Sequence, residues 1–178
     1  MLRRLLLFVT LLLIALAGGG VAVARGTPSL NASGPTSVSG TEESAVFQIA
    51  DRTVRQIRYA DGATLRYTFR VTNDGRLPVR VLGLDPEQPD TRLFTFTDLT
   101  PIEIPAGKTS EVTLSLAMGG CERLSSRAGS FVPEVAVRTE QAGLFEDVVT
   151  LTLPEEVHTS SPREAFCPNS TATSRPAG

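Results

Sequence analysis

A strict alternation of apolar and polar residues between positions 65 and 72 limits the fold of this chain more than any other feature. The apolar positions are Leu65, Tyr67, Phe69 and Val71. Successive side chains of a β-strand point to opposite faces of a sheet. A period of two therefore predicts a strand with one buried face and one face in water.

Six further segments carry shorter versions of this pattern, and turn-forming residues separate them. They lie near residues 45–59, 79–84, 93–99, 111–116, 134–138 and 149–153. The first of these strands comes from residues 45–49 or from residues 54–59, which the pattern leaves open. Asp61-Gly62 is predicted to close a hairpin before Leu65, and Asn73-Asp74-Gly75 and Pro105–Lys108 are predicted turns.

The pattern predicts an all-β fold. A single sheet that is polar on one side cannot hide its apolar face, so two sheets must stack or one must close into a barrel. Short strands and irregular connections favour stacking. We therefore predict one antiparallel β-sandwich of about seven strands.

The N-terminus carries the pattern of a targeting segment. Arg3 and Arg4 precede an uncharged apolar run that ends in the small residues Ala22 and Ala24. This is typical of a secretory signal peptide cleaved after Ala24. The alternative is an uncleaved helix that anchors the protein, because about 20 apolar residues span a bilayer. Both readings place the rest of the chain outside the cytoplasm, secreted or anchored to the cell membrane through residues 1–24.

The remaining residues divide into a domain with a loose segment on each side. Residues 25–44 are rich in Gly, Ser, Thr and Pro and are predicted to form a flexible stalk. Residues 168–178 have a similar composition and are predicted to be a disordered tail. The sandwich is predicted over residues 45–167.

Cys121 and Cys167 are the two cysteines of the chain. In an oxidising compartment two cysteines usually pair, so we predict a disulfide that ties the C-terminal end of the domain, from Pro154 onward, back across it. There is no C-x-x-C motif that would lower a thiol pKa, so a redox role is not predicted.

Composition argues against catalysis. His158 is the only histidine, placed in a polar tail after the last predicted strand, and no G-x-S-x-G motif occurs. These residues do not supply a metal cluster or a catalytic triad, so we predict no enzyme activity and no cofactor. Without Arg3 and Arg4, 15 basic residues face 19 acidic ones. This mild acidity disfavours a nucleic-acid partner.

Two groups of charged residues are candidates for surface contacts. Four arginines on the polar faces of predicted strands would form a basic stripe for an anionic polymer or for carboxylates of a partner, if the strands are neighbours: Arg66, Arg70, Arg80 and Arg138. The simpler alternative is cross-strand salt pairing, with Glu111 and Glu134. The loop Asp85–Asp90 holds three acidic residues and is a candidate calcium site, although it lacks the EF-hand pattern.

Two stretches resemble known proteins. YTFRVTNDGRLPVRVLGL (residues 67–84) followed by IPAGKTSEVTLSLAM (residues 104–118) is similar to bacterial immunoglobulin-like domains of exported proteins, a likeness that covers about residues 45–154. SPREAFCP (residues 161–168) resembles a segment of uncharacterised membrane-associated or secreted proteins of high-GC bacteria. The resemblance implies an immunoglobulin-like β-sandwich and an exported location, and it implies no activity. The chain departs from true immunoglobulin domains in having no Trp and in the placement of its cysteines.

Together these features predict a non-catalytic binding or structural module at the cell envelope. It would act through protein–protein contact, using a sheet edge or loops, on an envelope protein or polymer that the sequence does not identify. The alternative is an envelope domain that senses or binds a small anionic ligand or calcium, through the arginines or the acidic loop.

Overall fold

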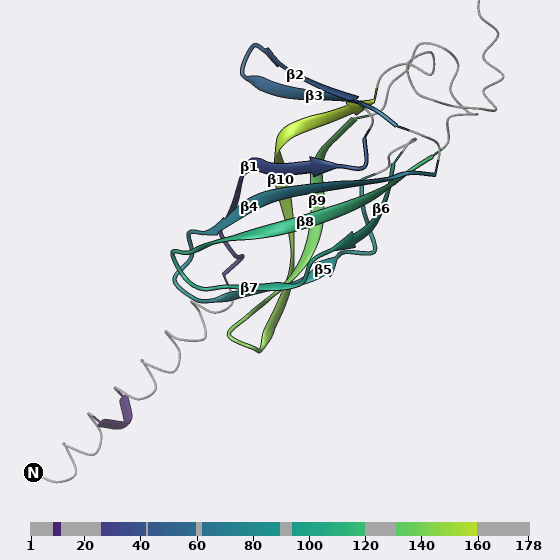
Figure 1. Cartoon of the computed structure of the whole chain (residues 1–178). Helices are drawn as coiled ribbons and strands as arrows, with labels where there is room; N and C mark the ends of the chain where they lie inside the picture. The colour runs from purple at the N-terminus through teal and green to yellow at the C-terminus, as the bar shows by residue number, and fades with distance from the viewer. Residues whose placement is uncertain are drawn as a thin grey trace, which may run out of the picture.

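Two β-sheets make up the part of the chain that the structure describes (Figure 1). The structure is a computed structural model, and it describes residues 9–11, 26–41, 43–59, 62–89, 94–119 and 131–159. The four-stranded sheet has the order β1 (Leu30–Ser39), β4 (Thr64–Asn73), β8 (Thr109–Met118), β6 (Phe94–Leu99). The six-stranded sheet has the order β2 (Glu43–Ile49), β3 (Arg52–Arg58), β10 (Phe145–Thr159), β9 (Phe131–Gln141), β5 (Val79–Leu84), β7 (Ile102–Ile104).

The alternation in β4 matches its burial, so the predicted strand is confirmed. Leu65, Tyr67 and Phe69 are fully buried, whereas Arg66 and Arg70 between them are exposed. The buried residues of β4 and β8 belong to one apolar core together with residues of β9 and β10 from the other sheet. The predicted all-β fold with two stacked sheets is therefore confirmed.

The predicted flexible stalk is wrong for residues 30–39, which form β1. This strand pairs with β4 from Leu30 opposite Asn73 to Ser39 opposite Arg66. The exposed backbone edge of β4 supplies the pairing, and the few apolar residues of β1 pack against the core. The sequence did not predict this strand because residues 30–39 are rich in Ser and show no apolar alternation. An edge strand needs few apolar side chains when the neighbouring strand provides the hydrogen bonds.

The number of strands also differs from the prediction, with ten in the described residues rather than about seven. Both candidates for the first strand are strands, namely β2 and β3, and they pair with each other through a turn at Ala50 and Asp51. Ala50 adopts a positive φ of 54° there. Alanine rarely adopts this conformation, so the sequence carried no turn signal at this position.

The hairpin predicted at Asp61-Gly62 is wrong, because β3 and β4 belong to different sheets. The chain crosses between the sheets at this point, and the Gly62 N–H donates to the carbonyl oxygen of Met118 at 2.8 Å. β3 instead pairs in parallel with the end of β10, from Val54 opposite Glu156 to Ile57 opposite Thr159. A local turn signal could not reveal this pairing between distant segments.

β10 is longer than the predicted last strand, and the polar tail expected from Pro154 onward is wrong as far as Thr159. Its register with β9 shifts between Thr152 and Val157, around Pro154. Proline has no N–H for the ladder, so the irregularity falls where proline stands. The strand continues through this shift to Thr159, and this part of it carries Glu155, Glu156 and His158.

The turn predicted at Asn73-Asp74-Gly75 is confirmed, and Asn73 organises it. The side-chain amide of Asn73 is fully buried and donates to the carbonyl oxygens of Leu77 at 2.8 Å and Ile104 at 3.0 Å. Its Oδ1 accepts the Gly75 N–H at 2.9 Å. One side chain thus joins the end of β4, the following turn and β7.

Replacing Asn73 by alanine is expected to lower the free energy of unfolding by about 2 kcal/mol, because it removes three hydrogen bonds made by a fully buried side chain. Urea unfolding followed by circular dichroism measures this loss. Asn31→Ala is the control, since the Asn31 side chain is exposed and donates to Asp74 at the surface; it should change the stability by less than about 0.5 kcal/mol. Equal losses in the two variants would contradict the assigned role of Asn73.

Several predictions concern residues outside the described ranges. Apart from residues 9–11, the predicted leader lies there, as do Cys121, Cys167 and the C-terminal tail. Among the residues that the structure does describe, none belongs to a helix with the length and apolar character needed to cross a bilayer.

Candidate functional site

The four outer strands of the two sheets differ in how well they could accept another strand. β1 contains Pro35, and its register with β4 shifts between Ser33 and Ser37. β6 has a register shift between Phe96 and Asp98. β7 has only three residues and lies between two prolines, Pro101 and Pro105. Short, shifted or proline-flanked edges are the forms that block edge-to-edge pairing.

β2 is the exception. It pairs with β3 over all seven residues without a register shift. Residues 44–49, called the β2 edge below, contain neither a charged residue nor a proline. Three apolar side chains on it are well exposed, with Val46 at 48%, Phe47 at 40% and Ile49 at 50%. Figure 1 shows the β2–β3 hairpin projecting from the sandwich, with β2 on its outer side.

The backbone groups on the open side of β2 follow from the hairpin geometry. Ile49 and Arg52 close the two-residue turn, so this pair is hydrogen-bonded. Hydrogen-bonded and non-hydrogen-bonded pairs alternate along an antiparallel ladder. Ser44, Val46 and Gln48 therefore turn their N–H and C=O groups toward the open side, while Phe47 shares a sheet face with its partner Val54.

A buried ion pair attaches the hairpin to the sandwich. Arg55 of β3 contacts Glu155 of β10 twice, Nε to Oε2 at 2.6 Å and Nη2 to Oε1 at 3.2 Å. The two side chains are only 15% and 7% exposed. Two parallel bonds of this kind fix the guanidinium against the carboxylate in direction as well as distance.

Tyr67 of β4 completes this buried cluster. Its hydroxyl is buried and makes no hydrogen bond of acceptable geometry with the described residues. Burial raises the pKa of Tyr67 above its ordinary range, and the negative charge of Glu155 raises it further. The phenol is therefore neutral. The cluster joins β4 of the four-stranded sheet to β3 and β10 of the six-stranded sheet.

A second, more exposed cluster lies beside it. Arg52 Nη2 contacts Glu156 Oε2 at 2.7 Å, and His158 Nε2 lies 2.9 Å from the same oxygen. Like Arg55 and Glu155, these residues join β3 to β10. The backbone ladder between the two strands has only four residue pairs, so the two side-chain clusters help to hold the β2 edge in place.

The structure does not unite the four arginines in one stripe. Arg66 and Arg70 lie on β4 of the four-stranded sheet, whereas Arg80 on β5 and Arg138 on β9 belong to the six-stranded sheet. The stripe required neighbouring strands, and β4 is not a neighbour of β5 or β9. Arg70 stands opposite Glu111 in the ladder. Glu134 stands opposite Thr152 instead of an arginine.

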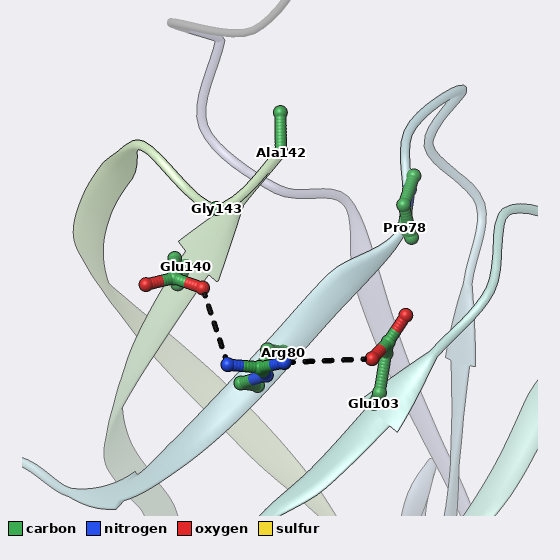
Figure 2. A pocket seen from close by; sticks show the side chains of 6 residues that line it. All are labelled: Pro78, Arg80, Glu103, Glu140, Ala142 and Gly143. Atoms are coloured by element: carbon green, nitrogen blue, oxygen red, sulfur yellow. Dashed lines mark ion pairs between the residues drawn. The ribbon is translucent and has the colours of Figure 1, made fainter.

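Arg80 lines a shallow cavity of about 320 Å³ with Pro78, Glu103, Glu140, Ala142 and Gly143. Figure 2 shows Arg80 between the two glutamates, with Nη2 3.8 Å from Glu103 and Nη1 3.7 Å from Glu140. The lining carries two carboxylates and one guanidinium, so its net charge is negative. It does not suit the small anionic ligand predicted for the arginines.

The acidic loop gives the calcium alternative no support in the described residues. Asp85 Oδ1 accepts the Glu87 N–H at 2.8 Å, so this carboxylate shapes the turn. Asp90 lies outside the described ranges. Within those ranges, no three His, Cys, Asp or Glu side chains stand close enough together to hold a metal ion.

Among the residues that the structure describes, the fold and the β2 edge together define an all-β protein of two stacked sheets with one regular, apolar edge that no described strand covers. Comparison of the sequence with known protein families and with curated proteins finds no match. The sequence had pointed to residues 45–49 only as a candidate strand. The signal that could have marked the edge was the run of uncharged residues from Ser44 to Ala50.

Proposed function

We propose that this chain is an exported, non-catalytic binding module of the cell envelope, and that it holds partner proteins by adding a strand to the β2 edge. The observation that carries the proposal is the contrast among the four outer strands. Three are interrupted by register shifts, prolines or shortness, and only the β2 edge, residues 44–49, is regular and uncharged with well-exposed apolar side chains. Proteins usually protect such an edge unless another chain pairs with it.

Strand addition suits the chemistry of this edge. Main-chain N–H and C=O groups of Ser44, Val46 and Gln48 would provide the hydrogen bonds of the new ladder. The exposed side chains of Phe47 and Ile49 would select a partner strand with apolar residues at alternate positions.

The order of the strands supports an immunoglobulin-like topology within this proposal. The orders β1-β4-β8-β6 and β10-β9-β5 correspond to the A-B-E-D and G-F-C orders of immunoglobulin domains. The β2–β3 hairpin is then an addition between the first two strands. In this chain β6, which corresponds to strand D, precedes β7, which lies beside β5, the counterpart of strand C. In variable-type domains the strand beside C precedes strand D instead.

Export and the disulfide belong to the same proposal. The basic start and apolar run of residues 1–24 support export, whether as a cleaved signal or as an anchor. Cys121 follows Met118 by three residues, and Cys167 follows Thr159 by eight. β8 ends at Met118, whose carbonyl oxygen accepts the Gly62 N–H just before β4. β10 ends at Thr159, which pairs with Ile57 near the end of β3. Both strand ends therefore lie near the connection from β3 to β4. The position of each cysteine shortly after one of these strand ends supports the proposed disulfide.

The test places a photo-crosslinking phenylalanine analogue at Phe47 of the full chain, in the cells that produce the protein. We expect adducts with a defined protein at Phe47 and none at Leu144, which is 78% exposed in the β9–β10 turn and serves as the control. The substitution Val46→Pro should abolish the adduct at Phe47. It removes an N–H that faces the open side and leaves the ladder with β3 intact. Equal crosslinking at both sites, or an adduct unaffected by Val46→Pro, would contradict strand addition.

A further inference from the structure

We infer that the strand added to the β2 edge is the β2 strand of a second copy, paired antiparallel about a two-fold axis that passes between the two Val46 residues. This inference rests on the proposed function and names the partner. The dimer would join two six-stranded sheets into one continuous sheet.

The hydrogen-bonding pattern selects this register. The residues that face the open side are Ser44, Val46 and Gln48. Pairing centred on Val46 sets Val46 against its symmetry mate and Ser44 against Gln48 of the other copy. All three open-side residues of each strand are then paired, which gives about six hydrogen bonds. Moving the centre to Ala45 or to Phe47 leaves one of these three without its counterpart.

The side chains also match in this register. Phe47 of each copy stands opposite Ala45 of the other, so a large residue meets a small one on both sides of the axis. Opposite residues in an antiparallel pair are the ones that interact most strongly.

Charge permits pairing with a second copy. Two identical strands carry identical charges, so a charged residue on the axis would face itself, and like charges opposite each other destabilise a ladder. The β2 edge has no charged residue from Ser44 to Ile49, so self-pairing meets no repulsion.

The opposite edge of the sheet explains why association would stop at two. β7, three residues long and flanked by Pro101 and Pro105, ends the six-stranded sheet on its other side. In the dimer both outer edges are β7, and neither can accept another strand. Two copies therefore form a closed, isologous assembly.

The experiment exploits the position of Val46 on the axis. We compare the wild-type chain, Val46→Lys, Val46→Glu and an equal mixture of the two variants, using full-length protein in mild detergent and sedimentation equilibrium. Each variant alone should dimerise more than tenfold more weakly than the wild type, since like charges face each other. The mixture should recover dimers, because lysine then faces glutamate. Leu144→Lys should leave the dimer unchanged.

Three results would overturn the inference: a wild-type protein that remains monomeric up to about 100 μM, variants that dimerise as well as the wild type, or a mixture that does not recover. Failure of the inference is distinguishable from failure of the proposed function. A monomeric wild type whose Phe47 crosslinks to another protein, sensitive to Val46→Pro, rejects the second copy and keeps strand addition. Loss of that crosslink as well rejects both.

Discussion

Replacing Gly40 by alanine is expected to lower the free energy of unfolding by at least about 4 kcal/mol, the largest effect foreseen for a single added methyl group in this chain. A Cβ at Gly40 would lie 1.9 Å from the carbonyl oxygen of Thr64 and 2.9 Å from its carbonyl carbon. Both are backbone atoms of β4, so no side chain can move aside. Gly40 also has a φ of +81°, which side-chain-bearing residues rarely adopt.

Gly62 provides the matched control for this prediction. It has a similar φ of +78°, but no heavy atom lies within 4 Å of a Cβ built there. Gly62→Ala therefore measures the backbone cost alone, about 1 kcal/mol. Urea unfolding followed by circular dichroism compares the two variants with the wild type. Similar losses in Gly40→Ala and Gly62→Ala would show that the link between β1 and β2 is not packed as described.

Breaking the buried ion pair is the second large effect. Glu155→Gln is expected to cost about 3 kcal/mol of unfolding free energy, because it removes the carboxylate charge that the Arg55 guanidinium, only 15% exposed, contacts twice. Arg55→Met should cost a similar amount by stranding the carboxylate. The double variant Arg55→Met with Glu155→Leu removes both charges and should recover most of the loss, since apolar replacements of buried pairs are often neutral.

Arg80→Gln is the control for this cycle. Arg80 is 56% exposed and lies 3.7 to 3.8 Å from its glutamates, so its loss should change stability by less than about 0.5 kcal/mol. Hydrogen exchange locates the damage, and we expect faster exchange in β2 and β3 of Glu155→Gln than in β4 and β8. A double variant as unstable as the single ones would contradict the role of the pair.

Elements that depend on local patterns could be predicted from the sequence. β4 and β8 alternate strictly because one face packs in the core, and the turn at Asn73 carries its own hydrogen-bonding residues. β1 was not predicted because backbone hydrogen bonds to β4, and only a few apolar side chains, hold it in place. The crossing at Gly62 looked like a hairpin because a turn signal does not say which sheet the next strand joins.

The candidate site was harder to predict, for a related reason. The apolar residues of β2 were visible in the sequence, but an edge exists only in relation to the strands that are and are not beside it. Arg55 and Glu155 are 100 residues apart, and a parallel pairing over four positions brings them together. Spacing along the chain cannot reveal such a pair. The arginines were grouped by their strand faces, yet two of them belong to the other sheet.

The direct passage of the chain from β1 into β2 has a mechanical consequence. One path for a pull on an occupied β2 edge follows the chain back into β1 and on toward Gly26. β1 is held along β4 by bonds that lie across the direction of this load. They would be strained in shear and resist together instead of opening singly. Tension along this path is thus resisted by the whole β1–β4 ladder at once, in addition to the bonds that join β3 to β10.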